Sequence, residues 1–194
     1  MSKQAFITKV DQNLFQNLQP STNDYLNQSY EEATFENCDF SNSDFSDTLF
    51  ENCQFEGCNL SNVKIINCKF QEVTFSQCKL SGLDLSQLSK MLLAVAFVDC
   101  NIAFCNFSDL NLSHTKFTNC KLDTCDFIGT NLQGAVFENT GLQESQFDNC
   151  NLSAADFRTA HDFAIDPGRN KLDKALFSLQ GALTFLKPLN IIIE

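Results

Sequence analysis

A bulky apolar residue returns every five positions through most of this 194-residue chain. The first run covers positions 35 to 85, the second covers positions 97 to 157, and every central position in both runs is Phe, Leu or Ile. Five matches neither the 3.6-residue period of a helix nor the two-residue period of a strand. A coil with one straight side and one corner per five residues keeps each fifth side chain pointing inward. A fixed period sustained over this length therefore predicts a repeat architecture.

Several stretches of the chain follow one five-residue pattern, including CDFSNSDFSD (38–47), CNLSN (58–62), CNFSDLNLSH (105–114) and AADFRT (154–159). They resemble the pentapeptide-repeat family, whose consensus is A-(D/N)-(L/F)-X-X, over about residues 30–160. The resemblance implies an all-β fold, a right-handed quadrilateral β-helix with four units per coil, in which residues 20 apart stack. The 24 units would then make six coils, a rod roughly 30 Å long at the usual spacing between strands.

Each of the ten cysteines lies two residues before a central position. The other residues at this position are compact, as a second inward position beside a bulky side chain requires. We therefore expect buried, free thiols. A disulfide framework or a metal site is the alternative, but stacked side chains point in parallel and no His accompanies them. The expected columns are Cys38/Cys58/Cys78, Cys100/Cys120 and Cys105/Cys125.

Residues 1–29 precede the regular repeat, and we predict that they form an N-terminal cap. A β-helix exposes the backbone edge and the core of its first coil, so a cover is needed there. Thr8 and Asp11 frame a helix start, and Val10, Leu14 and Leu18 would share one helical face. The alternative is a mobile arm that binds a partner.

The register of the repeat breaks within residues 86–96. Leu85 and Phe97 are 12 residues apart, where 10 would keep register. We predict a bulge or short loop whose apolar residues, Met91, Leu92 and Leu93, tuck inward. The alternative is a projecting recognition loop, for which a polar sequence is more typical.

Residues 161–194 no longer follow the repeat. The segment IDPGRN (165–170) predicts a turn, and Ser178 can cap a helix that ends at Pro188, followed by a last strand. This segment has more apolar side chains than a cap needs, and a closed two-fold homodimer is the commonest way to bury such a patch. The predicted dimer-interface residues are Leu183, Phe185, Leu186, Leu189, Ile191 and Ile193.

Residues 155–194 and the segment FVDCNIAFCNFSDLNLSHTKF (97–117) are similar to one branch of the family, the Qnr, MfpA and microcin-B17-immunity (McbG-like) proteins. The resemblance implies that the C-terminal module pairs two rods end to end. It also implies a function, because this branch protects DNA gyrase or topoisomerase IV from quinolones or peptide toxins and is thought to mimic duplex DNA. The larger projecting loops of Qnr proteins from Gram-negative bacteria have no counterpart of that length in this chain.

The repeat region is strongly acidic. Residues 31–157 contain 18 Asp and Glu against 6 Lys, a net charge of −12, and the whole chain has −11. Duplex DNA as long as the six-coil rod carries about 18 phosphate charges, so the acidic counts are similar. The alternative is that acidity serves only solubility. The predicted partner-binding residues are the densest acidic stretch, Glu31, Glu32, Glu36, Asp39, Asp44, Asp47, Glu51 and Glu56.

Two pairs in that stretch, Glu31/Glu51 and Glu36/Glu56, would be like-charge stacks, which destabilise a sheet unless something else selects them. Asp44, Lys64 and Asp84 would instead form a column that compensates its own charge.

No catalytic motif is recognisable in the sequence. His114 falls at an outward corner and His161 lies beside Asp162, without a nucleophile placed by a known pattern. The many Asp and Asn residues are required by the repeat. We therefore expect no enzyme, no cofactor and no metal site. Direct nucleic-acid binding is not expected either, because the net charge repels phosphate.

The expected location is the cytoplasm, without membrane association. No apolar stretch approaches the ~18 residues of a membrane span, and the start, MSKQAFITKVDQN, lacks the apolar region of a signal peptide. The sequence thus favours an acidic DNA mimic that binds a type II topoisomerase, DNA gyrase or topoisomerase IV. The alternative is a non-catalytic protein–protein interaction scaffold with a different partner.

Overall fold

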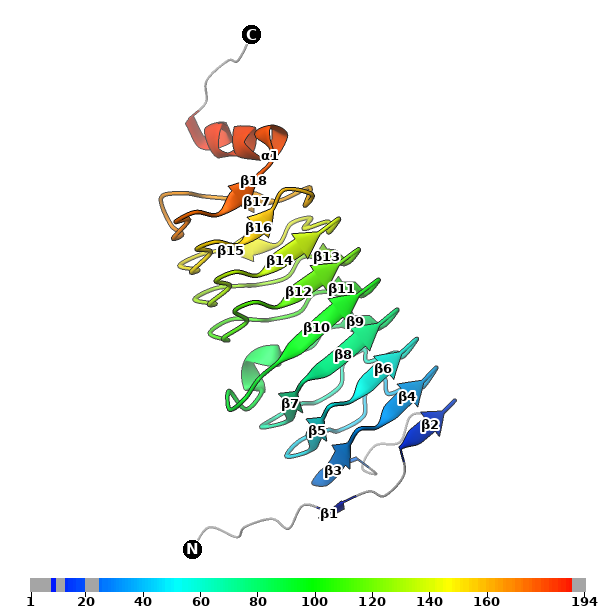
Figure 1. Ribbon diagram of the computed structural model, residues 1–194. Coiled ribbons are helices and arrows are strands. Elements are labelled where there is room, and N and C mark those ends of the chain that lie inside the picture. The colour runs from blue at the N-terminus through cyan, green and yellow to red at the C-terminus, as the bar shows by residue number, and fades with distance from the viewer. Residues whose placement is uncertain (1–7, 10–12, 20–24, 190–194) are drawn as a thin grey trace, which may run out of the picture.

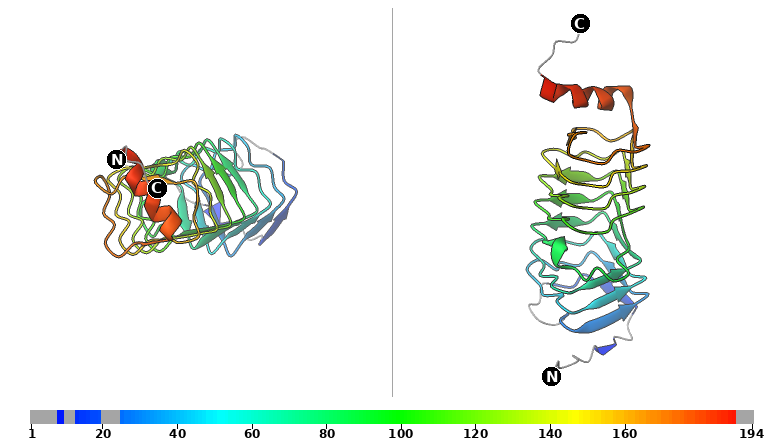
Figure 2. Two further views of the ribbon diagram at one scale, coloured as in Figure 1. Left: turned by 90° about the horizontal axis from the view of Figure 1, so that it is seen from above. Right: turned by 90° about the vertical axis from the view of Figure 1, so that its left-hand side faces the viewer.

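The computed structural model describes residues 8–9, 13–19 and 25–189 and is an elongated rod (Figure 1). It is a parallel β-solenoid of about eight turns with one short helix near the C-terminus. Seen along its axis, each coil has a four-sided outline, and the helix lies across the end of the stack (Figure 2). The predicted quadrilateral β-helix is confirmed.

Each coil contributes a short stretch of backbone to four walls, which we name after one strand of each. The chain passes in turn through the β10, β11, β15 and β5 walls. The β10 wall is a nine-stranded sheet of β2 (Leu14–Gln16), β4 (Thr34–Glu36), β6 (Gln54–Glu56), β8 (Val73–Ser76), β10 (Val95–Val98), β12 (Lys116–Thr118), β14 (Val136–Glu138), β16 (Asp156–Phe157) and β18 (Leu176–Phe177). The β11 wall contains β9 (Lys79–Ser81), β11 (Asn101–Ala103) and β13 (Lys121–Asp123).

The other two walls rely more on isolated bridges between coils. The β15 wall joins the bridged residues Asp44, Lys64, Asp84, Asn106 and Asp126 to β15 (Gln146–Phe147) and β17 (Ala164–Ile165). The β5 wall consists of β1 (Thr8–Lys9), β3 (Gln28–Glu31), β5 (Leu49–Glu51) and β7 (Lys69–Gln71), and later of the bridged residues Asn111, Asn131, Asn151 and Lys171. A 3-10 helix, η1 (Leu85–Gln87), precedes the interruption of this wall.

Columns of stacked phenylalanine rings form the core. On the β10 wall, Phe117 and Phe137 have ring centroids 4.9 Å apart and planes 1° apart. Rings from the opposite β10 and β15 walls meet edge to face, as Phe107 and Phe117 do at 84°. Both arrangements are favoured by the ring quadrupole. Leu and Ile take the central places in the other columns, as Leu60 and Leu80 do above Phe40, so large apolar side chains fill the interior from end to end.

The ladder begins before residue 30, and the helix predicted in the N-terminal segment is wrong for the described residues. Leu14–Gln16 is strand β2, paired with β4, and Phe15 stacks on Phe35 at 4.7 Å. The reason is that Phe15 occupies a central position, 20 residues before Phe35, so the ladder satisfies backbone groups that a helix would have bonded internally. Val10 and Asp11, on which the helix prediction also rested, lie outside the described residues.

The ladder also continues past residue 160. Phe157 stacks on Phe177 at 5.2 Å, and β15 pairs with β17 through Phe147 and Ile165. The predicted turn at 165–170 is present, with the Gly168 N–H donating to Asp166 Oδ1 at 2.8 Å. The rod therefore has about eight turns rather than six, which gives it a length of roughly 38 Å.

A helix closes the C-terminal end of the solenoid. The predicted cap is confirmed, since Ser178 Oγ accepts a hydrogen bond from the Gly181 N–H at 3.0 Å and α1 (Leu179–Leu183) follows. A second 3-10 helix, η2 (Thr184–Leu189), continues it. Gly181 is buried, and a Cβ at this position would lie 2.9 Å from Phe163 Cζ. The helix can approach the last coil this closely only because residue 181 has no side chain.

The register break is an insertion of two residues at Lys90–Leu93. The Ser89 N–H donates to Cys68 O, which keeps the hydrogen-bond spacing of the regular coils. The Phe70 carbonyl then accepts from the Ala94 N–H, so the extra residues lie between Ser89 and Ala94. The prediction that all three apolar residues tuck inward is wrong for two of them. Met91 is 66% and Leu92 71% exposed. Leu88 and Leu93 take the inward places on either side of the turn, which leaves Met91 and Leu92 outside.

Candidate interaction surface

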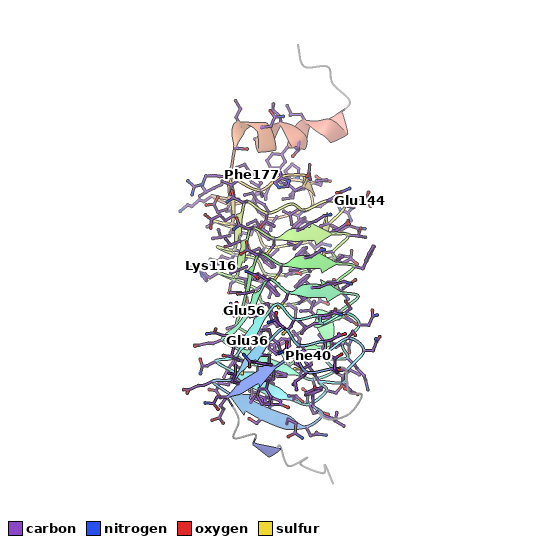
Figure 3. The ribbon with its side chains drawn as sticks, turned by 90° about the vertical axis from the view of Figure 1, so that its right-hand side faces the viewer. Glu36, Phe40, Glu56, Lys116, Glu144 and Phe177 are labelled. Carbon is purple, nitrogen blue, oxygen red and sulfur yellow. The ribbon has the colours of Figure 1, made fainter. Side chains whose placement is uncertain are left out.

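The eight acidic residues predicted to bind a partner do not form one face. Glu31, Glu32 and Glu51 lie on the β5 wall, Glu36 and Glu56 on the β10 wall, Asp39 on the β11 wall, and Asp44 and Asp47 on the β15 wall. They form a ring around the first coils. Figure 3 shows Glu36 and Glu56 on the same side of the rod, with Glu56 above Glu36.

The two like-charge stacks are present. Glu31 is the ladder partner of Glu51, and Glu36 is the ladder partner of Glu56. Gln16 Nε2 donates to Glu36 Oε2 at 2.6 Å, so one carboxylate of the second stack has a neutral donor beside it. Like charges in adjacent strands cost stability, so these pairs are not explained by the packing of the fold.

The aspartates of this set are held by hydrogen bonds. Asp39 accepts from the Ser41 N–H at 2.9 Å, and this bond is the main reason why the pKa of its carboxyl is lowered. Burial raises the pKa of Asp44, but bonds from Ser46 and Lys64 outweigh it, so its pKa is also lowered. Both carboxylates therefore stay ionised at neutral pH with fixed orientations.

The four walls differ in net charge. For this count, a residue at a corner between two walls belongs to the wall that precedes it along the chain. The β15 wall is the most acidic, at −5. Its charged residues are Asp44, Asp47, Asp84, Asp109, Asp126, Asp148 and Asp166, with Lys64 and Arg169. The β10 wall, at −3, has Glu36, Glu56, Asp99, Glu138 and Asp156, with Lys116 and Arg158.

The remaining two walls are closer to neutral. The β11 wall, at −2, has Asp39, Asp123, Glu144 and Asp162, with Lys79 and Lys121. The β5 wall without β1, at −1, has Glu31, Glu32, Glu51, Glu72 and Asp173, with Lys69, Lys90, Lys171 and Lys174.

Bases compensate the β15 wall only near its ends. Lys64 pairs with Asp44 at 3.0 Å, as the sequence predicted, and Arg169 pairs with Asp148 at 2.5 Å. Asp84, Asp109 and Asp126 lie between these pairs, and within the described part of the chain none of the three forms an ion pair. Lys64 forms no ion pair with Asp84 in the described part of the chain, so the predicted compensation of charge reaches only Asp44; Asp84 accepts a hydrogen bond from Asn106 Nδ2 at 2.9 Å.

Apolar side chains are exposed at the C-terminal end. Leu179 is 82%, Leu176 44% and Leu183 37% exposed. Of the predicted dimer residues, Phe185 instead packs edge to face on Phe177 of its own chain at 4.8 Å, and Leu186 is half-buried. Nothing is described for the side chain of Leu189 or for Ile191 and Ile193. Leu179, which the sequence prediction did not include, is the most exposed apolar residue among those described at this end.

Five of the thiols form one column, which the sequence divided into two. The insertion changes the offset to 22 residues, so Phe75 pairs with Phe97 and Cys100 follows Cys78. Each thiol of this column has a carbonyl partner, as Cys78 Sγ has Phe55 O at 3.3 Å. All ten cysteines are free and buried. Burial raises the pKa of Cys53 to about 11, which leaves that thiol protonated at neutral pH.

Other chemical arrangements are few. His161 Nδ1 lies 2.8 Å from Asp162 Oδ2, and both side chains are exposed. Over residues 8–9, 13–19 and 25–189, no group of three or more His, Cys, Asp or Glu side chains is placed to hold a metal ion. The helices of that same part of the chain are too short and too polar to cross a bilayer.

Comparisons with known families agree with the repeat geometry. The family model described as a pentapeptide repeat region matches residues 29–91, and the model of pentapeptide repeats (8 copies) matches residues 97–139 and 120–158. The match of the first model ends within the insertion, and the matches of the second begin after it. The chain belongs to the pentapeptide-repeat family. No curated protein matches it by sequence.

Solved structures with the same fold include HetL, a pentapeptide repeat protein involved in heterocyst differentiation regulation from the cyanobacterium Nostoc sp. strain PCC 7120. It is 13% identical, the match covers 87% of this chain and 88% of HetL, and the TM-score is 0.53. QnrB1, a plasmid-mediated fluoroquinolone resistance protein, is 22% identical over 94% of this chain and 98% of its own, with a TM-score of 0.45. At 13% identity, the likeness to HetL concerns the fold.

Proposed function

We propose that this protein binds a type II topoisomerase, DNA gyrase or topoisomerase IV, by occupying the site of a DNA segment, and so protects the enzyme from quinolones or a peptide toxin. The observation that carries the proposal is the β15 wall, a rigid stripe with a net charge of −5 whose central aspartates lack bases. The similarity of residues 97–117 and 155–194 to the Qnr, MfpA and McbG-like branch supports the same reading.

The physical basis of the proposal is charge at fixed positions. Asp84 and Asp126 lie two strands apart on the β15 wall, about 9.6 Å at the usual strand spacing. A protein surface that grips DNA has Lys and Arg at the positions of phosphates. A rod with carboxylates at fixed positions can bind such a basic surface in place of DNA. Little side-chain entropy is lost on binding, because the carboxylates are already held in place.

The experiment that tests the proposal is competition with DNA. Binding of the protein to immobilised gyrase and topoisomerase IV is measured at several salt concentrations, with and without linear duplex DNA. The proposal requires affinity that falls steeply with salt and binding that duplex DNA displaces. Binding that does not depend on salt and is not displaced by duplex DNA would support the second candidate, a scaffold for another partner. The exposed apolar insertion favours that candidate, because a phosphate mimic has no use for Met91 and Leu92.

We further propose that two rods associate through their C-terminal ends, which would double the length of the acidic surface. The exposed side chains of Leu179 and Leu183 support this proposal, because a closed dimer would bury them.

Replacing both leucines, L179E/L183E, is expected to give a monomer whose coils remain folded, since neither side chain belongs to the phenylalanine core. Sedimentation velocity measures the change, with circular dichroism as the check on the fold. The matched control is Q180E with T184E, two added charges on the same helical segment. A dimer that persists in L179E/L183E would contradict this assignment of the interface.

A further inference from the structure

The insertion at Lys90–Leu93 ends the sheet of the β5 wall. Strand β7 pairs with β5 on one side, and on the other side the insertion stands where the next strand would lie. Beside it lies a hollow of about 380 Å³, lined by Glu51, Glu72, Leu92 and Leu93 among others. The interruption of the repeat thus creates a concave feature on an otherwise regular wall.

The hollow combines two carboxylates with aliphatic side chains. Within the described residues, neither the Glu51 nor the Glu72 side chain has a hydrogen bond or an ion pair. Lys69 and Lys90 lie on the same wall but do not line the hollow. A site with an apolar wall and unpaired carboxylates fits a side chain with a hydrocarbon stem and a cationic head. Arginine fits it best, because its planar guanidinium can bond two carboxylates in one plane.

A second hollow, of about 470 Å³, adjoins the first. The two share Asn52, Glu72 and Ala94, and the second extends around the corner to Thr74 and Val95 on the β10 wall. Together they form a continuous depression across one corner of the rod. Its extent suits a polypeptide segment that delivers the cation rather than a small cation alone.

The two outer residues of the insertion are unfavourable for the isolated chain. Leu92 has a left-handed backbone, with φ of 57°, and its side chain is 71% exposed. A left-handed backbone is energetically unfavourable for Leu, whereas Asn or Gly adopts it more readily. Exposed apolar side chains in strained backbone are a feature of contact sites.

We infer that this depression binds a segment of a partner protein in which an arginine is flanked by apolar residues. The guanidinium lies between Glu51 and Glu72, and the flanking apolar side chains pack on Met91 and Leu92. This site lies on the β5 wall, away from the acidic stripe of the β15 wall, so the inference does not rest on the proposed topoisomerase function.

The test uses the full chain and short capped peptides as probes. Titration with the peptide GLRLG, followed by amide chemical shifts, is expected to give saturable changes confined to residues 51–52, 71–72 and 90–94. Two control peptides, GLQLG without the charge and GGRGG without the apolar flanks, are each expected to bind at least about tenfold more weakly than GLRLG. Equal binding of GLQLG would overturn the role of the carboxylates.

Variants separate a specific site from general acidity. E51Q/E72Q is expected to weaken GLRLG binding about tenfold, whereas E36Q/E56Q removes the same charge from a pair of glutamates on the β10 wall and is expected to leave binding unchanged. M91Q/L92N is also expected to weaken binding, and it keeps the fold because Asn accepts the left-handed turn. Equal loss in both glutamate variants, or shifts spread over every acidic wall, would overturn the inference.

Discussion

Replacing Phe127 with aspartate is expected to prevent the solenoid from folding. Phe127 is fully buried and stacks between Phe107 at 4.8 Å and Phe147 at 4.9 Å, with edge contacts to Phe117 and Phe137. Loss of a buried Phe side chain alone costs about 3–5 kcal/mol. The carboxylate adds the cost of an unpaired charge in an apolar interior, several kcal/mol more.

That total approaches or exceeds the whole stability of a typical domain, about 5–15 kcal/mol. Circular dichroism and urea unfolding measure the effect. F127L is the matched control, because Leu already occupies central positions such as 122 and 132, and it is expected to cost only about 1–2 kcal/mol. A folded F127D that unfolds cooperatively would show that the ring column does not hold the coils together.

Neutralising the centre of the β15 wall is expected to cause the largest loss of partner binding. D84N/D109N/D126N removes the three aspartates that lie between the two ion pairs, and each change keeps the side-chain shape. All three carboxylates would face the same basic surface of gyrase, so their contributions to binding add. We therefore expect the affinity for gyrase to fall by about 100-fold, near 1 kcal/mol for each charge. The slope of affinity against salt should also become shallower.

The control for net charge is E36Q/E56Q/E138Q, which removes three carboxylates from the β10 wall. This variant has the same net charge as the first and should bind within about threefold of the unchanged protein. Biolayer interferometry at several salt concentrations compares them. Equal losses in the two variants would mean that net charge, and not the β15 wall, determines binding.

The sequence predicted the core because one residue type recurs at a fixed interval. Phe35, Phe55 and Phe75 are the same residue 20 positions apart, and the ladder places them in one column. The same interval reaches Phe15, but one unit alone does not reveal a period, so a helical pattern seemed equally good there. The period is thus informative only where several units follow one another.

The surface was harder to predict than the core, because neighbours on a wall are 20 or 22 residues apart. Glu31 to Glu56 is the densest acidic stretch of the sequence, yet the coil distributes it over four walls. The β15 stripe collects its aspartates from distant units, and the 22-residue offset at the insertion aligns Asp84 with Asn106. That offset could be counted from the sequence, but the side on which Met91 and Leu92 emerge depends on which residues fill the core at that level.

The most direct test of the proposed function is a gyrase supercoiling assay with a fluoroquinolone present, in which this protein is titrated from sub-stoichiometric amounts to a large excess. The account predicts restored supercoiling at low ratios and inhibition at high ratios, as the protein first displaces DNA from the drug-trapped enzyme and then competes with the substrate. D84N/D109N/D126N should show neither effect. No change in supercoiling at any ratio, with gyrase or in the matching decatenation assay with topoisomerase IV, would contradict it.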